Sequence, residues 1–323
     1  MFSPPYLEGA GGVLVSYPWN PTIRIRPYKT TYPTFLTEAK DKTSMEFNTI
    51  EVPIDGAGPE AQQNISIYSD VHIGSTHCAL DRLKRHMDAR AKLPNARFIM
   101  LGDMWDFVLR GDTRRFLPSE QVHSPVDAAL DADFMDAYQF LKRYPIDIMH
   151  LGNHEFEVLK RHYTNPIQIM CDKLDVLYGG YSSFLRYVFR TDSKDKQRGL
   201  EGGRTATFLL HHGAWGGKVV KGFGGARDYA RAYDDWDVFA YGHNHQYNVH
   251  KEVSIGLTAK GRPRIRDRYF VNTGTWLQTA TEGSLGYGER RGYGPTALGS
   301  PLVKLTPTRT NGVNIKVSID DNY

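Results

Sequence analysis

The sequence predicts an α/β protein in which a layered β-sheet sandwich is flanked by helices. Short apolar runs alternate along the chain with stretches of helical periodicity, which is the pattern of a layered α/β domain. A second observation is that polar side chains follow several of these runs directly. With 323 residues, 40% of them hydrophobic, the chain is long enough to bury one large core or two modest ones.

Six apolar runs are predicted to be buried strands, because each is short and built from large apolar residues. They span residues 65–68, 98–101, 146–149, 207–210, 238–241 and 269–271. The stretches between them are long enough to hold helices and loops.

Three helices are predicted between these strands. The first spans residues 79–92. Ser124-Pro125 begins the second and Asn165-Pro166 begins the third, since Ser and Asn are good cap residues and Pro is favoured at the first helical position. One face of the second helix carries Leu130, Phe134, Tyr138 and Leu141. The third offers for burial Ile167, Ile169, Met170 and Leu174.

The chain divides into two parts by composition. Residues 1–60, rich in Pro, Tyr and Thr, are interpreted as an N-terminal extension of unknown role that includes an alternating, extended-looking stretch at 22–26. Residues 61–323 form the main domain. Two insertions are expected in it, at about 107–144 and 213–233.

Charge and composition exclude several classes. A formal net charge of +4 is far from the dense basic stripe of a dedicated nucleic-acid binder, although it suits an anionic substrate. No stretch approaches the roughly 18 consecutive apolar residues of a membrane span, and the N-terminus resembles no secretory signal. Cys78 and Cys171 lack metal-binding spacing, so we expect reduced thiols in a cytoplasmic protein.

Polar residues follow five of the six predicted strands. Asp-Val-His (70–72) follows the first, Gly-Asp-Met-Trp-Asp (102–106) the second and Gly-Asn-His-Glu (152–155) the third. The fourth is followed by His-His-Gly (211–213) and the fifth by Gly-His-Asn-His (242–245). Because open α/β sheets place their sites at the carboxyl ends of strands, these side chains are expected to meet at one edge.

The residue types are those that a site for two metal ions requires. Carboxylate oxygen can bridge two cations, imidazole binds zinc, iron or manganese, and an amide oxygen adds a neutral ligand. Glycine before Asp103, Asn153 and His243 permits a sharp turn and close approach of the backbone. Each motif alone is an ordinary loop composition. No structural argument requires all five in one chain, so together they predict a metal site.

The five motifs, in this order, resemble the signature of the calcineurin-like metallophosphoesterase superfamily. That signature is Asp-x-His, Gly-Asp-x-x-Asp, Gly-Asn-His-Asp/Glu, a lone His and Gly-His-x-His. The resemblance covers about residues 64–276, because Val-Asn-Thr-Gly-Thr (271–275) is similar to the Asn-x-Gly-Ser/Thr strand that follows the last histidines in this family. It implies the family's sandwich fold and a metal-dependent hydrolase.

The resemblance also implies a ligand set. One metal would be held by Asp70, His72 and His245. The second would be bridged by Asp103 and completed by Asn153, His243 and one histidine of the 211–212 pair. Alignment of the preceding strand and of Gly213 favours His212, and His211 remains the alternative.

Two further residues have implied catalytic roles. In the family the residue matching His154 binds no metal but lies near the leaving group, where imidazole stabilises charge or donates a proton. Asp106 resembles the carboxylate that orients this histidine; its alternative role is a solubilising loop residue. The implied mechanism is in-line attack at phosphorus by a hydroxide bound between two cations roughly 3.5–4 Å apart.

Cations in the two insertions are predicted substrate contacts, with a solvated charged loop as the alternative. They are Arg114 and Arg115 in the first insertion and Lys218 and Lys221 in the second.

The favoured function is a phosphomonoesterase or phosphodiesterase acting on a phosphorylated small molecule. Its cofactors would be two divalent ions, manganese first, with iron or zinc as alternatives. A variant of this function is a pyrophosphatase like those acting on bacterial lipid precursors, since the 102–106 loop and the arginines after it look similar.

Two alternatives remain. The first is a DNA exo- or endonuclease of the same superfamily, for which nucleic acid would be the partner. The second is a non-catalytic metal-binding scaffold, which the presence of every ligand and of His154 disfavours.

Overall fold

The computed structural model describes residues 48–108, 122, 129–191, 193–197, 199, 203–215, 222–257, 261–279, 294–308 and 312–319. The chain divides into two compact units, Met1–Met45 and Glu46–Tyr323. All of the described residues belong to the second unit.

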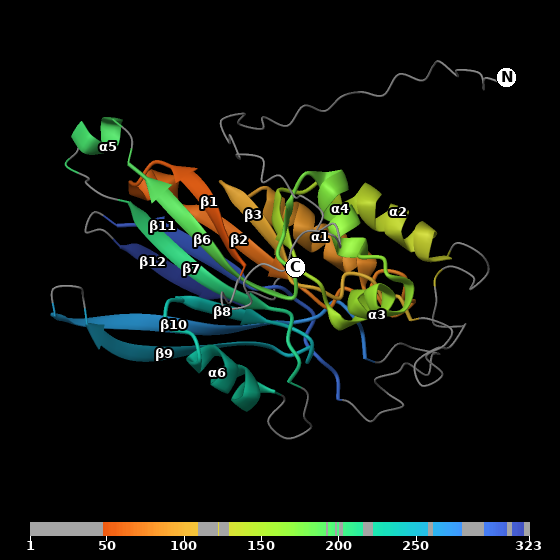
Figure 1. Ribbon diagram of the computed structural model, residues 1–323. Coiled ribbons are helices and arrows are strands. Elements are labelled where there is room, and N and C mark those ends of the chain that lie inside the picture. Colours follow the sequence, from red (N-terminus) through yellow and green to blue (C-terminus); the bar gives the residue numbers. More distant parts are fainter. Residues whose placement is uncertain are drawn as a thin grey trace, which may run out of the picture. The chain divides into compact units, whose positions relative to one another are not determined.

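Two six-stranded sheets form this unit (Figure 1). The strands of the first sheet are, in spatial order, β1 (Thr49–Asp55), β6 (Ser182–Arg190), β7 (Arg204–His211), β8 (Val238–Tyr241), β10 (Pro263–Thr273) and β9 (Tyr247–Leu257). Those of the second are β12 (Val313–Ser318), β11 (Leu302–Pro307), β2 (Gln63–Tyr68), β3 (Ala96–Met100), β4 (Ile146–Met149) and β5 (Leu177–Tyr178). Strands β2 to β5 run parallel to one another, as do β7, β8 and β10. The pairs β2–β11, β6–β7 and β9–β10 are antiparallel.

One core lies between the two sheets. Apolar side chains of the second sheet, among them Ile67 and Ile99, pack with residues of the first such as Phe208 and Val271. All four are fully buried. Burial between the sheets explains why the strands that contain them are apolar in sequence.

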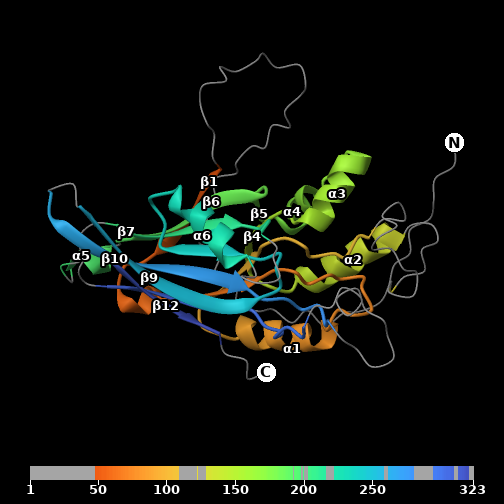
Figure 2. The same ribbon diagram turned by 90° about the horizontal axis from the view of Figure 1, so that it is seen from below.

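Helices cover the outer faces of both sheets (Figures 1 and 2). Four of them pack on the second sheet: α1 (Leu80–Ala91), α2 (Ala129–Leu141), α3 (Asn153–His162) and α4 (Pro166–Leu174). On the first sheet, α6 (Phe223–Arg231) buries Ala226 and Ala230. Two short helices, η1 (Pro59–Ala61) and α5 (Ser193–Gln197), complete the described elements. None of the described helices is long and apolar enough to cross a membrane.

The structure confirms the predicted layered α/β sandwich and all six predicted strands, as β2, β3, β4, β7, β8 and β10. The first and third predicted helices occur as α1 and α4, and the Asn165 side chain caps α4 by accepting a hydrogen bond from the Gln168 amide at 3.1 Å. The second predicted helix occurs from residue 129, whereas its expected start at Ser124 lies outside the described residues.

One packing prediction on α4 is wrong. Ile169 is 40% exposed, whereas Ile167 and Met170 are fully buried. The helical repeat places residues three and four apart on one face, so Ile167, Met170 and Cys171 face the core and Ile169 points away.

The segment predicted as an extension contains a strand of the sheet. Residues 49–55 form β1, which pairs in parallel with β6, and residues 59–61 form η1. The boundary at residue 60 followed a Gly- and Pro-rich stretch, which is the loop between β1 and β2. The strand itself has no long apolar run, because only Val52 and Ile54 of it are buried.

Candidate metal centre

Side chains from both sheets meet at the carboxyl ends of their strands. The loops after β2, β3 and β4 come from the second sheet, and the loops after β7 and β8 come from the first. Ligand atoms within 4.8 Å of one another form three overlapping groups among the described residues: Asp70, His72 and His245; Asp103, His212 and His243; and His72, Asp103 and His154. The predicted ligands thus lie together as the sequence led us to expect.

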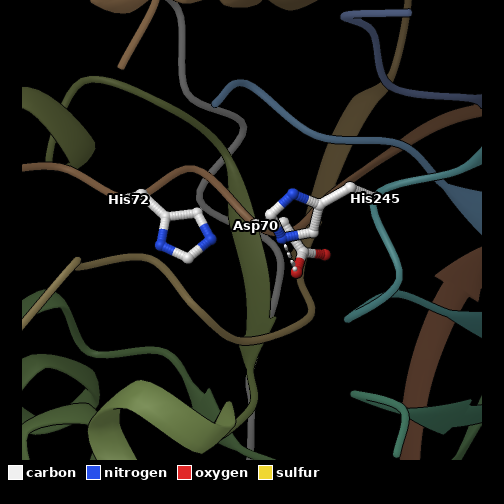
Figure 3. Close-up of side chains that lie close together, drawn as sticks. All are labelled: Asp70, His72 and His245. Atoms are coloured by element: carbon white, nitrogen blue, oxygen red, sulfur yellow. Dashed lines mark ion pairs between the residues drawn. The ribbon is translucent and has the colours of Figure 1, made fainter. Parts of the chain in front are cut away.

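The first group combines one carboxylate with two imidazoles (Figure 3). His245 Nε2 lies 3.3 Å from Asp70 Oδ1, and the rings of His72 and His245 lie 5.2 Å apart. Asp70 is fully buried and His72 is 2% exposed, so this charge and the His72 ring are withdrawn from water. Such burial is costly unless the groups bind one another or a cation.

The second group is built around Asp103 and His212. His212 Nε2 lies 3.2 Å from Asp103 Oδ2 and 3.2 Å from Asn153 Oδ1. His243 Nδ1 lies 2.6 Å from the same Asn153 oxygen. One carboxylate, one amide oxygen and two imidazoles therefore meet at this end of the site.

The hydrogen bonds of two histidines show that cations fit both groups. His212 Nδ1 donates to the Leu101 carbonyl at 2.8 Å, so a neutral His212 directs an unprotonated Nε2 at two oxygen acceptors. His72 Nδ1 lies 3.1 Å from Asp106 Oδ1, and its buried Nε2 has no hydrogen-bond partner among the described residues. Converging lone pairs of this kind are the donor set of a divalent metal.

The pKa values of Asp103 and His212 show that the buried carboxylate is stabilised by positive charge next to it. Burial raises the pKa of Asp103, but the neighbouring His212 and His154 outweigh it, so the pKa lies well below its usual value. Burial lowers the pKa of His212, but Asp103 outweighs it and the pKa rises to about 10. Without a metal, the carboxylate therefore holds a proton on the adjacent imidazole.

The backbone is strained where the ligands converge. Of the nine non-glycine residues with positive φ in the described part of the chain, five are predicted ligands: Asp70, His72, Asp103, His243 and His245. The left-handed region costs an L-residue of order 1 kcal/mol, and such conformations concentrate at functional sites.

Glycines allow the loops to approach closely, as predicted. A Cβ on Gly102 would lie 2.6 Å from the Gly152 amide nitrogen, and one on Gly242 would lie 2.5 Å from Asp70 Oδ2. A Cβ on Gly152 would collide with Asp103. Glycine before Asp103, Asn153 and His243 is therefore required by the space between loops.

Glu155, to which the sequence analysis gave no role, ties two ligand loops together. Its carboxylate accepts hydrogen bonds from the amides of Asp103, Met104 and Trp105, at 3.1, 2.7 and 3.1 Å, and from Gly152 at 2.9 Å. Burial and the charge of Asp103 raise the pKa of Glu155 to about 7, whereas the amides favour the carboxylate. Only the tertiary structure places these amides around one side chain.

His154 and Asp106 lie together beside the first group. The rings of His154 and His72 are 4.6 Å apart, and the His154 amide donates to Asp103 Oδ1 at 2.9 Å. His154 Nδ1 donates to the Asp106 backbone carbonyl, while the Asp106 carboxylate is closer to His72, at 3.1 Å, than to His154, at 3.9 Å. Residue 106 therefore contacts His154 with its backbone and His72 with its side chain.

The two histidines after β7 differ in surroundings. His212 is fully buried between Asp103 and Asn153, whereas His211 Nδ1 accepts from the Gly213 amide at 2.8 Å. The His211 ring packs against Trp215 and Tyr229, at 4.9 and 4.7 Å. The geometry thus favours His212 of the two as a ligand.

The predicted substrate contacts Arg114, Arg115, Lys218 and Lys221 lie outside the described residues. Further along the second insertion, Arg227 and Arg231 pair with Glu252 of β9.

Two facing sheets that deliver histidine, carboxylate and amide ligands to one edge define a class of metal-binding protein. A family model described as calcineurin-like phosphoesterase matches residues 64–247, more than half of the chain. The chain belongs to this family, in agreement with the resemblance of its five motifs.

Other comparisons add little. Among solved structures, Vps29 from Chaetomium thermophilum is similar over 80% of this chain and 93% of its own, with 11% identity and a TM-score of 0.30. No curated protein matches the chain in sequence.

Proposed function

We propose that this protein is a two-metal-ion phosphoester hydrolase, acting as a phosphomonoesterase or a phosphodiesterase. The observation that carries the proposal is the convergence of buried lone pairs: His212 Nε2 with Asp103 and Asn153 oxygens in one group, and His72 Nε2 near Asp70 in the other. Two neighbouring groups that each need a cation, linked by Asp103, are the arrangement that phosphoester hydrolysis uses.

In this proposal Asp70, His72 and His245 hold one ion, and Asn153, His212 and His243 hold the other, with Asp103 shared. Two ions bound there would activate water and offset negative charge on the phosphoryl oxygens. Both ions are proposed to be manganese, with iron or zinc as alternatives, because imidazole and carboxylate ligands bind all three metals.

His154 is proposed as the residue that assists the leaving group. Its Nδ1 donates to the Asp106 carbonyl, so Nε2 is the atom that can carry a proton to an alkoxide or stabilise its charge. Asp106 is proposed to position both rings, His72 through its carboxylate and His154 through its carbonyl.

The proposed substrate is a phosphorylated small molecule. Arg114, Arg115, Lys218 and Lys221 remain its proposed contacts. The proposed setting is the cytoplasm, which suits the free Cys78 and Cys171.

The test begins with metal-stripped protein to which manganese is restored. Hydrolysis of p-nitrophenyl phosphate, bis-p-nitrophenyl phosphate and labelled single- and double-stranded DNA is then compared for the wild type, Asp103→Asn and His154→Ala. Matched controls are Asp81→Asn, whose carboxylate is exposed, and His162→Ala at the exposed end of α3.

Activity that returns with metal, is lost in both site variants and is kept in both controls would support the proposal. A strong preference for DNA would replace it with a nuclease. Two bound ions without turnover on any of these substrates would leave a narrow substrate range or a non-catalytic scaffold.

A further inference from the structure

The outer part of β9 and β10 is a two-stranded ribbon that extends past its neighbours (Figures 1 and 2). Only residues 269–272 of β10 pair with β8, whereas β9 pairs with β10 along its whole length. Residues 263–268 of β10 therefore have β9 as their one partner strand among the described residues. We call residues 252–257 and 263–268 the outer ribbon.

One face of the outer ribbon is aliphatic and exposed. Val253, Ile255, Leu257 and Ile265 are 62%, 77%, 73% and 72% exposed. They are four of the ten large hydrophobic residues that are exposed in the described part of the chain, and Ile255 lies directly opposite Ile265. Exposed apolar residues scattered singly need no explanation, but a contiguous set indicates a contact surface.

This aliphatic face continues the face that forms the core. Side chains alternate along a strand, so the outer residues share a face with Val249 and Val271, which pack between the two sheets. The Lys251–Asp267 ion pair, at 2.7 Å, stands on the same face between the buried and the exposed parts. The core therefore ends at this pair, and the aliphatic pattern continues beyond it with no covering layer among the described residues.

Basic residues accompany the aliphatic ones. Residues 252–268, which span the outer ribbon, include Lys260 and four arginines against two acidic residues, Glu252 and Asp267. Arg264 pairs in register with Gly256, on the opposite face of the ribbon from Ile255 and Ile265. The ribbon is thus amphipathic, with aliphatic groups on one face and cationic charge on the other and near its end.

We infer that the outer ribbon docks this protein on the surface of an anionic lipid bilayer. Its aliphatic face would enter the boundary between headgroups and acyl chains, and Arg262 and Arg264, which are exposed, would extend to the phosphates. Anionic headgroups attract nearby Lys and Arg side chains.

Other occupants fit the ribbon less well. A second copy would bring the same positive charge to the contact, which opposes association. Nucleic acid would use the cations but would leave the aliphatic side chains in water.

The test is co-sedimentation of the whole chain with vesicles of phosphatidylcholine, alone or mixed with phosphatidylglycerol. We expect binding to the mixed vesicles at low ionic strength that is about tenfold or more stronger than to phosphatidylcholine alone, and that weakens with salt. Ile255→Ser with Ile265→Ser should lower this binding about tenfold or more. Arg262→Gln with Arg264→Gln should lower it about tenfold and reduce its salt dependence.

The matched control is Ile169→Ser with Ile319→Ser, which changes two aliphatic side chains that are 40% and 39% exposed outside the ribbon. Thermal melts establish that all three double variants are folded. Absence of binding to mixed vesicles, equal binding to both vesicle types, or an equal loss in the control overturns the inference. A dimer seen by light scattering, abolished by the isoleucine pair in the absence of any vesicle binding, also overturns it and assigns the ribbon to a second copy.

Discussion

The metal centre and the outer ribbon both depart from the usual distribution of polarity, in opposite directions. At the metal centre polar groups are buried: Asp70 and His212 have no exposed surface. On the ribbon aliphatic groups are exposed, Ile255 by 77%. Each departure costs free energy in the isolated chain, and a bound cation or a lipid surface would offset that cost.

The backbone differs as well between these two regions. Five predicted ligands have positive φ, whereas no described residue within β9 or β10 does. Ligand atoms must converge on a point a few ångströms wide, which regular strands cannot achieve. A docking face needs only regular alternation along a strand, so it requires no strain.

The largest expected effect tests the metal centre. Asp103→Asn removes the charge shared by the two groups, so hydrolysis should fall by about a thousandfold or more. Elemental analysis should show fewer bound ions per chain. Full activity in this variant would contradict the shared role of Asp103.

The next effect separates catalysis from metal binding. His154→Ala should lower the turnover number by about a hundredfold to ten-thousandfold, because the leaving group loses its proton donor. The metal content should stay unchanged, since no ligand is removed. An equal loss of turnover in His162→Ala would show that the effect does not depend on the place of His154 beside the metal ligands.

A substitution of Glu155 tests how much a buried carboxylate that binds only backbone amides contributes to stability. Glu155→Gln places an amide donor against backbone donors, so the free energy of unfolding should fall by about 2–4 kcal/mol. Urea titration measures it. Glu157→Gln, which breaks a partly exposed pair with Arg161, should change the free energy by less than about 1 kcal/mol.

The two ends of β10 differ in burial within one strand. Val271→Ala, at a fully buried position, should cost about 2–3 kcal/mol of unfolding free energy. Ile265→Ala removes more apolar surface but from an exposed position, so it should cost at most about 0.5 kcal/mol. Similar costs in urea titrations would show that the ribbon is covered in the free protein.

The last effect depends on pH and concerns a buried histidine outside the proposed ligand set. Burial lowers the pKa of His150 to about 3, although its Nε2 lies 2.8 Å from Ser183 Oγ. In the unfolded chain this histidine gains a proton as the pH falls through about 6.5, and in the folded chain it does not. Stability should therefore fall from pH 6.5 downward, by about 1.4 kcal/mol per pH unit from this residue.

His150→Leu measures that contribution by difference. The slope of unfolding free energy against pH between 4 and 6 should be smaller in the variant by about one proton. Equal slopes would mean that His150 is protonated in the folded state.

Strands buried on both faces were predictable because burial leaves continuous apolar runs. Strands such as β6 and β11 were not, since they alternate buried and half-buried residues and carry Arg186 and Lys304 within them. The strand β1 was missed for the same reason, and the boundary of the extension followed the glycines after it.

The site divides in the same way. The motifs identified the ligand types and their place after the strands, because ligand chemistry restricts which side chains can bind. They did not identify Glu155, whose role depends on four amides from two loops. They favoured His212 but left His211 open, since the two are adjacent in sequence and differ in which groups face them.

The layered α/β class, the family and the residue types at the strand ends followed from the sequence, because short-range pattern and ligand chemistry lie in consecutive residues. Three features became known from the folded structure: which lone pairs converge, that residue 106 contacts two histidines, and that the aliphatic face of β9 and β10 continues past the core. These depend on distances between segments far apart in the chain, which no local pattern contains.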